Sequence, residues 1–266
     1  MRKKFIWLMT MAVSLGLALS GCAQQAAAPQ AETIKIGLQA PLTGDYAAEG
    51  QWAKQSVDVA AELINQKGGV LGKPVEIVVV DDASNPKDSA LAAQKIVSQG
   101  LQEVIASYGS SVTAPAADLY DANKVVSVGY GATAVRLTME KERPYFFRTA
   151  GRDDTQSEFF VKFATETLGA KRIAIMHDNQ DYGKGVAEDT MKFLQPLVDA
   201  KQVEVVYYDA ITPGESDYSA VISQIKEINP DVWFFTAYYS EAALLLKQAR
   251  DAGVTSIFVG NNAVPT

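Results

Sequence analysis

The feature that most constrains the fold is a regular alternation between short apolar runs rich in β-branched residues and longer stretches with helical periodicity. Strands separated by helices of this length predict parallel sheets with right-handed crossovers, and so an α/β fold. The run at residues 75–80 is nearly continuous in apolar residues, which is typical of a parallel strand covered on both faces. The predicted strands are 34–38, 75–80, 104–107, 125–128, 172–176, 203–208, 232–236 and 257–259, and the predicted helices are 48–66, 86–99, 113–123, 156–168, 183–200, 217–228 and 241–252.

The alternation breaks once, near the middle of the chain. Residues 139–144 are polar, and residues 145–149 form a short extended run that no helix precedes, which indicates a crossover between two lobes. We therefore predict two Rossmann-like lobes with parallel sheets flanked by helices, the first over residues 33–148 and the second over residues 149–266.

The N-terminus has the pattern of a secretory signal, with a basic start and an apolar stretch over residues 5–19. Cys22 is the only cysteine and directly follows a Leu-Ser-Gly run. This run resembles the lipobox of bacterial lipoproteins, which implies a signal peptide over residues 1–21 and a lipid on the Cys22 sulfur; the alternative is a signal peptide with an incidental cysteine. Residues 22–32 then supply the lipidated cysteine and a flexible tether without apolar periodicity.

The charge of the chain excludes some partners. Removal of residues 1–21 leaves 21 Lys and Arg against 31 Asp and Glu, a formal charge of −10. Binding to nucleic acid, or to a membrane through charge, needs clustered Lys and Arg. We therefore expect no nucleic acid partner, and membrane contact through the N-terminal lipid alone.

Small polar and aromatic residues follow the predicted strands, at the edge where ligands bind in open α/β sheets. Hydroxyls and glycines follow the strands of the first lobe, and tyrosines and amides follow those of the second. Two such edges facing each other would form a cleft that closes on a small polar molecule. These candidates are Ser110, Ser111, Gly131, Ala132, Thr133, Tyr182, Tyr238 and Asn262.

The predicted helix 113–123 begins close to Ser110 and Ser111. A helix N-terminus offers unpaired N–H donors and a positive dipole, which suit a carboxylate. The sequence alone equally allows a structural interpretation, in which Ser110 and Ser111 only cap the helix and residues 131–133 only form a turn.

At these residues the chain resembles the leucine/isoleucine/valine-binding proteins, the substrate-binding subunits of branched-chain amino-acid ABC transporters with the type I periplasmic-binding fold. The resemblance covers nearly all of residues 34–266 in family order. The matching runs are IKIGLQAPLTGDYAAEGQ at 34–51, NQKGGVLGKPVEIVVVDDASNPKDS at 65–89, YGSSVTAPAAD at 108–118, FFRTAGRDDTQ at 146–156, RIAIMHDNQDYGKG at 172–185 and LLLKQARDAG at 244–253.

The resemblance implies a role for each candidate. In the family, the position of Ser110 holds the ligand carboxylate with help from the position of Thr133. The position of Gly131 supplies a main-chain carbonyl to the ligand ammonium. Tyr182 and Tyr238 match second-lobe tyrosines that cover the ligand once the cleft closes.

The chain departs from the family pattern in ways that bear on the ligand. Asn262 stands where the family often has an acid that balances the ammonium, and Glu49 matches an aromatic residue of the side-chain pocket, which indicates a different or more polar pocket. A disulfide of some members, between positions matching Ser84 and Gly109, cannot form. The family also continues beyond residue 266, so we expect a truncated chain with an incomplete first lobe that leaves an apolar face uncovered.

The sequence thus predicts an extracytoplasmic lipoprotein that captures an amino acid, expected to be branched-chain or aliphatic, and delivers it to the membrane permease of an ABC transporter. Its expected place is at the bacterial membrane, on the cell surface or in the periplasm. One alternative is a small carboxylate or amide without an α-ammonium, which Asn262 motivates, and another is the ligand-binding module of a sensory receptor. His177 is the only histidine, and no nucleophile, dinucleotide or metal motif occurs, so we expect neither an enzyme nor a cofactor.

Overall fold

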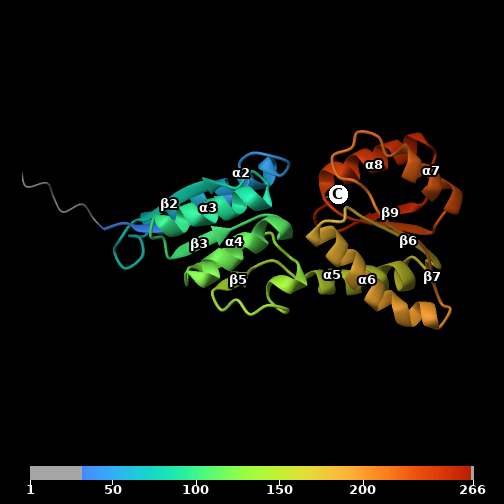
Figure 1. Ribbon diagram of the computed structural model, residues 1–266, viewed down its shortest axis with the longest axis horizontal. Helices are drawn as coiled ribbons and strands as arrows, with labels where there is room; N and C mark the ends of the chain where they lie inside the picture. Colours follow the sequence, from blue (N-terminus) through green and yellow to red (C-terminus); the bar gives the residue numbers. More distant parts are fainter. Residues whose placement is uncertain (1–31, 265–266) are drawn as a thin grey trace, which may run out of the picture.

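The computed structural model describes residues 32–264, and the predicted signal peptide and lipidated Cys22 lie outside them. The described part has two parallel sheets flanked by helices, one formed by the N-terminal half of the chain and one by the C-terminal half (Figure 1). This confirms the predicted fold class.

The first sheet has the strand order β2-β1-β3-β4-β5. Its pairing register places Gly37 of β1 beside Val78 of β2 and Val104 of β3. Asn85 caps α3 by accepting hydrogen bonds from the N–H groups of residues 87 and 88, as the Asn-Pro pair predicts. The elements are β1 (Ile34–Ala40), α2 (Ala47–Gln66), β2 (Val75–Asp81), α3 (Pro86–Ser98), β3 (Glu103–Ala106), α4 (Ser110–Ala122), β4 (Val126–Gly129), the 3-10 turn η1 (Val135–Leu137) and β5 (Phe146–Arg148).

The second sheet has the order β7-β6-β8-β9 and is covered on both faces. Alternate residues of its central strands enter two separate cores: Ile173 and Phe234 pack with α5 and α6, whereas Met176 and Trp233 pack with α7 and α8. The elements are α5 (Asp153–Lys162), the π-helical turn η2 (Phe163–Thr167), β6 (Arg172–His177), α6 (Asp181–Asp199), β7 (Glu204–Ala210), α7 (Ser219–Ile228), β8 (Val232–Thr236), α8 (Tyr239–Asp251) and β9 (Ile257–Gly260).

The structure corrects two expectations about strands. Residues 75–80 do not form a strand buried on both faces, because β2 lies at the edge of its sheet and is only partly buried. The run 145–149 is more than a connection, since its residues 146–148 form β5, the fifth strand of the first sheet. Both runs are apolar, and apolarity alone does not say where in a sheet a strand lies.

One face of the first sheet is incompletely covered. Ile105, Val128 and Phe147 lie in register on neighbouring strands, where the first two are half-buried and Phe147 is 54% exposed. On the helix α2, Val59 and Leu63 are also exposed. Part of this face is therefore exposed, which agrees with the expected uncovered face, and the incompleteness of the first lobe stays a prediction.

The two tryptophans in the described residues differ. The sequence places both in apolar patterns, which predicts that both are core residues. Trp233 is fully buried, as predicted. The prediction for Trp52 is wrong, because its side chain is 60% exposed and lies on α2. Within residues 32–264, no helix is long and apolar enough to cross a membrane.

Candidate functional site

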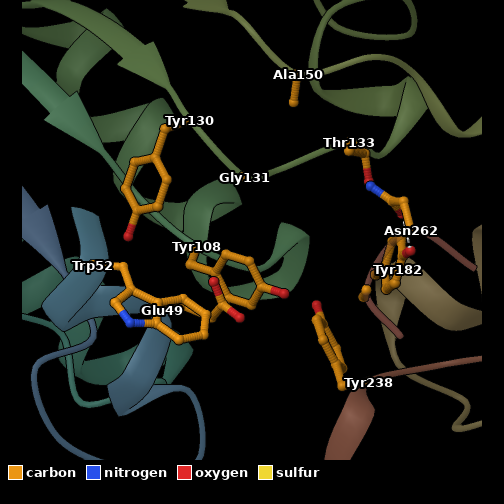
Figure 2. A pocket seen from close by; sticks show the side chains of 11 residues that line it. Glu49, Trp52, Tyr108, Tyr130, Gly131, Thr133, Ala150, Tyr182, Tyr238 and Asn262 are labelled. Carbon is orange, nitrogen blue, oxygen red and sulfur yellow. Dashed lines mark hydrogen bonds between the residues drawn. The ribbon is translucent and has the colours of Figure 1, made fainter. Parts of the chain in front are cut away.

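A cavity of about 390 Å³ lies between the two lobes, at the carboxyl ends of the strands of both sheets (Figure 2). The first lobe contributes the start of α2 and the segments after β3 and β4. The second lobe contributes Ala150, the start of α6 and the segments after β8 and β9. The lining residues are Glu49, Trp52, Tyr108, Tyr130, Gly131, Thr133, Ala150, Tyr182, Tyr238, Asn262 and Ala263.

Most of the sequence-predicted site residues come together here. Those that line the cavity are Glu49, Gly131, Thr133, Tyr182, Tyr238 and Asn262, whereas Ser110, Ser111 and Ala132 are not among its lining residues.

The three remaining candidates lie behind the cavity wall. Ser110 is the first residue of α4, three residues earlier than the sequence indicates, and its hydroxyl accepts a hydrogen bond of 3.1 Å from the Ala134 N–H. Ser111 follows it in the first turn of α4. Ala132 is fully buried in a small core with Leu137. In this structure the Ser110 hydroxyl therefore ties the loop after β4 to the start of α4.

The Tyr238 side chain of the second lobe lies close to the N-terminus of α4. A Cβ added to Gly109, the N-cap of α4, would lie 3.2 Å from the Tyr238 hydroxyl. The Tyr238 ring also packs against Tyr46, with ring centroids 4.4 Å apart, and against Tyr182, at 5.1 Å. A tyrosine of the second lobe thus stands in front of the helix N-terminus of the first lobe.

Two polar contacts join the lobes beside this tyrosine cluster. The Tyr239 hydroxyl donates a hydrogen bond of 3.2 Å to the main-chain oxygen of Asp45. Arg136, in η1 of the first lobe, forms an ion pair with Asp181 at the start of α6. Both pairs are accessible to solvent, so each contributes little on its own.

Gly131 stands in a position that requires glycine. A Cβ at residue 131 would lie 2.5 Å from the Tyr108 ring, too close for any side chain. The neighbouring Thr133 accepts, through its main-chain oxygen, a hydrogen bond of 3.1 Å from the Asp153 N–H. These contacts fix the loop after β4 between Tyr108 and the start of α5.

Asn262 is held by two hydrogen bonds. The Tyr182 hydroxyl donates to its Oδ1, and its own N–H donates to Gln156 Oε1 over 3.3 Å. The amide oxygen is therefore already engaged, which leaves the Asn262 NH₂ group as a donor. An amide in this position supplies no negative charge for a ligand ammonium.

The cavity is lined by a single charged side chain. Glu49 is partly buried, and this burial raises the pKa of its carboxyl above the usual range. Behind Thr133, burial raises the pKa of Asp153 to about 6, although hydrogen bonds from the side chains of Thr133 and Gln156 oppose the shift. In the second lobe, burial likewise raises the pKa of Asp178 to about 6. Among residues 32–264, no group of three metal-ligating side chains is placed to hold a metal ion.

Sequence reasoning missed three aromatic lining residues. Tyr108 lies two residues after β3, just before Ser110, and Tyr130 directly follows β4, next to Gly131. The rule about strand ends could therefore have found both. Trp52 lies one helical turn after Glu49 on α2. That spacing indicates that Glu49 and Trp52 share one face of α2. The apolar residues around Trp52 instead favour a core position.

Comparison with known sequences identifies the family. The sequence pattern of the family described as "Periplasmic binding protein" matches residues 33–264. The chain belongs to this family. The members matched below are binding proteins by name, which agrees with the expectation that the chain is not an enzyme.

Two curated relatives show the level of similarity. The Leu/Ile/Val-binding protein BraC3 of Rhizobium johnstonii is 38% identical over 231 residues, which cover 87% of this chain and 62% of the relative. The leucine-, isoleucine-, valine-, threonine-, and alanine-binding protein of Pseudomonas aeruginosa is 36% identical over 248 residues, 93% of this chain and 65% of the relative. The chain therefore spans less than two thirds of the length of these relatives.

A solved structure shows the same fold. The branched-chain amino acid transporter substrate-binding protein LivJ of Streptococcus pneumoniae, in complex with isoleucine, superposes with a TM-score of 0.78 at 28% identity. The match covers 86% of this chain and 64% of that protein. The architecture is thus that of the type I periplasmic-binding fold, as the resemblance implied.

Proposed function

We propose that this protein is an extracytoplasmic solute-binding lipoprotein that captures an amino acid in the cavity between its lobes and delivers it to the permease of an ABC transporter. The observation that carries the proposal is the composition of the cavity wall, to which both lobes contribute polar groups at their strand ends. Branched-chain and aliphatic amino acids are the first candidates, because the names of the relatives include leucine, isoleucine and valine.

The lining suits a zwitterion. Thr133 offers a hydroxyl and Gly131 a main-chain carbonyl on the first-lobe side, which fit the carboxylate and the ammonium respectively. Tyr182, Tyr238 and Asn262 would cover the ligand from the second lobe. The structure puts these groups around one cavity, and their individual roles are part of the proposal.

In this proposal, Ser110 and Ser111 bind the carboxylate in a second arrangement of the site. Tyr238 would have to leave the α4 N-terminus, so that the ligand carboxylate takes its place in front of the first N–H groups of the helix. Ala132 would contribute only its main chain there, since its side chain is fully buried. The chain connection between the lobes, at residues 148 and 149, would then be a hinge of this movement.

The anchor and the transporter partner belong to the same proposal. A lipid on Cys22, followed by the tether, would hold the protein at the outer face of a bacterial membrane within reach of a permease. Mass spectrometry of the chain purified from bacterial membranes would show a diacylglyceryl group on Cys22. Recovery of the chain with an unmodified Cys22 thiol would contradict this part of the proposal.

A thermal-shift panel of amino acids and small carboxylates tests the binding proposal. A ligand present at about 100 times its dissociation constant adds roughly 2.7 kcal/mol of stability. Thr133→Ala should remove this shift, whereas Ser223→Ala, on the exposed side of α7, serves as the matched control. If no amino acid stabilises the chain, or if Thr133→Ala leaves the shift intact, the proposed site is wrong.

One observation favours a second candidate ligand. The Asn262 amide oxygen already accepts a hydrogen bond from Tyr182, and the amide supplies no negative charge there for an ammonium. A small carboxylate or amide without an α-ammonium would fit that arrangement. In the same panel, a shift with 4-methyl-2-oxopentanoate and none with leucine would support this candidate over the first.

A further inference from the structure

Glu49 is the one charged side chain that lines the cavity, and it has no partner. Within residues 32–264, its carboxylate makes neither a hydrogen bond nor an ion pair, although it is partly buried. No Lys or Arg is among the lining residues. A carboxylate that is partly removed from water without compensation costs free energy, which a donor or a cation bound beside it would offset.

A second unpartnered group lies in the same part of the cavity. The Tyr130 hydroxyl is buried and has no hydrogen-bond partner among the described residues. Figure 2 shows Tyr130, Trp52 and Glu49 together, across the cavity from Thr133 and Asn262. The Tyr130 ring lies in the loop after β4, so first-lobe segments far apart in the sequence build this end of the cavity.

Aromatic rings complete this part of the wall. Trp52, Tyr108 and Tyr130 all line the cavity near Glu49. Burial is the main cause that raises the pKa values of Tyr108 and Tyr130, and the nearby Glu49 charge raises them further. The faces of aromatic rings attract cations, and Trp is the most effective. The Glu49 carboxylate lies among aromatic rings, and no basic residue lines the cavity. This environment favours a positively charged group.

An anionic or purely aliphatic ligand end fits this environment poorly. An anion would meet the Glu49 carboxylate, and an aliphatic group would exclude water from it while leaving it unpaired. A cationic nitrogen would donate hydrogen bonds to Glu49 and contact the rings.

We propose that the captured amino acid carries a second, positively charged nitrogen at the end of its side chain, bound by Glu49 and in contact with the ring of Trp52. The ligand class is therefore the diamino acids. This inference rests on the proposed function, because it assumes that the cavity takes an amino acid whose α-carbon groups lie toward Thr133 and Asn262.

The test compares ligands that differ only by the second ammonium. Lysine and norleucine share a four-carbon side chain, and ornithine and norvaline form a shorter pair. Calorimetric titration near pH 7.5 measures the dissociation constant of each ligand for the unmodified chain and for Glu49→Gln, which keeps the shape of the side chain and removes its charge. Glu62→Gln, on the same helix and exposed, is the control variant.

We expect lysine or ornithine to bind at least about tenfold more tightly than its monoamino counterpart, since a close charge pair in a desolvated site contributes more than the energy of one decade in affinity. Glu49→Gln should abolish this preference and leave the affinity for the monoamino acid within about twofold. Glu62→Gln should preserve the preference. Melting temperatures of the variants without ligand verify that each one is folded.

Three results overturn the inference. If norleucine binds as tightly as lysine, and norvaline as tightly as ornithine, the cavity has no preference for a second ammonium, while the proposed amino-acid capture stands. If Glu49→Gln weakens both members of a pair equally, Glu49 binds the α-ammonium instead. If the unmodified chain binds no amino acid of the full panel, the proposed function itself fails.

Discussion

The two sheets differ in how completely helices cover them. In the second lobe, α5 and α6 cover one face of the sheet and α7 and α8 the other, and all five residues of β8 are buried. In the first lobe, α3 and α4 pack on one face, whereas on the other face Phe147 stays largely exposed. Most of the exposed large apolar side chains of the described residues belong to the first lobe.

This difference does not extend to the cavity. The first lobe contributes six of the lining residues, including the charged Glu49, and its loops are packed tightly around Gly131 and Ser110. Binding geometry therefore depends on the strand ends and the helix starts, whereas the apolar coverage of the sheets determines stability. The two lobes should respond differently to core substitutions and similarly to substitutions at the cavity.

The largest expected difference comes from the same substitution in each lobe. Leu245→Ala, at a fully buried position of α8, should lower the free energy of unfolding by about 2–5 kcal/mol, because it leaves a cavity in a two-sided core. Leu63→Ala, at a position 51% exposed on α2, should change it by less than about 1 kcal/mol. Urea unfolding measures both, and equal losses would show that the lobes are covered alike.

A smaller effect is expected from the free-energy cost of ionising a buried carboxyl group in the second lobe. The folded-state pKa of Asp153, about 6, exceeds its value in the unfolded chain, so the folded protein binds more protons and loses stability as the pH rises from about 4 to about 6. Because asparagine does not ionise, Asp153→Asn does not show this pH-dependent loss of stability. The variant should therefore gain roughly 2–3 kcal/mol relative to the unmodified protein between pH 4 and pH 7.

Unfolding by urea at several pH values checks this prediction. The variant must be compared with the unmodified protein at each pH, since Asp81, Asp118 and Asp231 have lowered pKa values and make the protein as a whole less stable toward low pH. A constant difference across the range would mean that Asp153 has an ordinary pKa.

Glycines near the cavity test whether the lobes are equally tight there. A Cβ at Gly50 in α2 would lie 1.9 Å from the Pro41 carbonyl oxygen, and one at Gly183 in α6 would lie 2.1 Å from the Thr236 carbonyl oxygen. Gly50→Ala and Gly183→Ala should each cost about 1–3 kcal/mol or more. Gly185→Ala, which meets no atom within 4 Å, should stabilise α6 by about 0.5–1 kcal/mol. If Gly50→Ala does not lower the free energy of unfolding, packing next to the cavity is tight only in the second lobe.

The smallest effect concerns the uncovered face itself. A dye that fluoresces on apolar surfaces should bind the native protein, and Phe147→Lys should reduce its emission because it places a charge in the exposed row of β5. Stability should change by no more than about 0.5 kcal/mol. Phe159→Lys, at an exposed position of the second lobe, is the control. If both variants reduce the dye emission equally, the exposed apolar surface is not concentrated in the first lobe.

The order and type of the elements could be predicted from the sequence, because each strand and helix has its own periodicity. The position of a strand within a sheet could not, as β2 and β5 show, because pairing depends on residues distant in the sequence. The same limit applies to Trp52, whose apolar neighbours on α2 suggest a core position although they are themselves exposed.

For the site, the strand-end rule places Gly131, Thr133, Tyr182, Tyr238 and Asn262 around one cavity, and the structure brings them there. What the sequence could not supply is the arrangement between lobes. Tyr238 stands in front of the α4 N-terminus only because the second lobe approaches the first, which no local pattern records.

The fluorescence of Trp52 tests the central claim, that an amino acid binds between the lobes. Trp52 lines the cavity, whereas Trp233 is buried in the second-lobe core away from it. The account predicts a saturable change in tryptophan emission, with the midpoint that calorimetry gives for the same amino acid, and its loss in Trp52→Phe. Binding detected by calorimetry with unchanged Trp52 emission would place the ligand elsewhere and contradict the account.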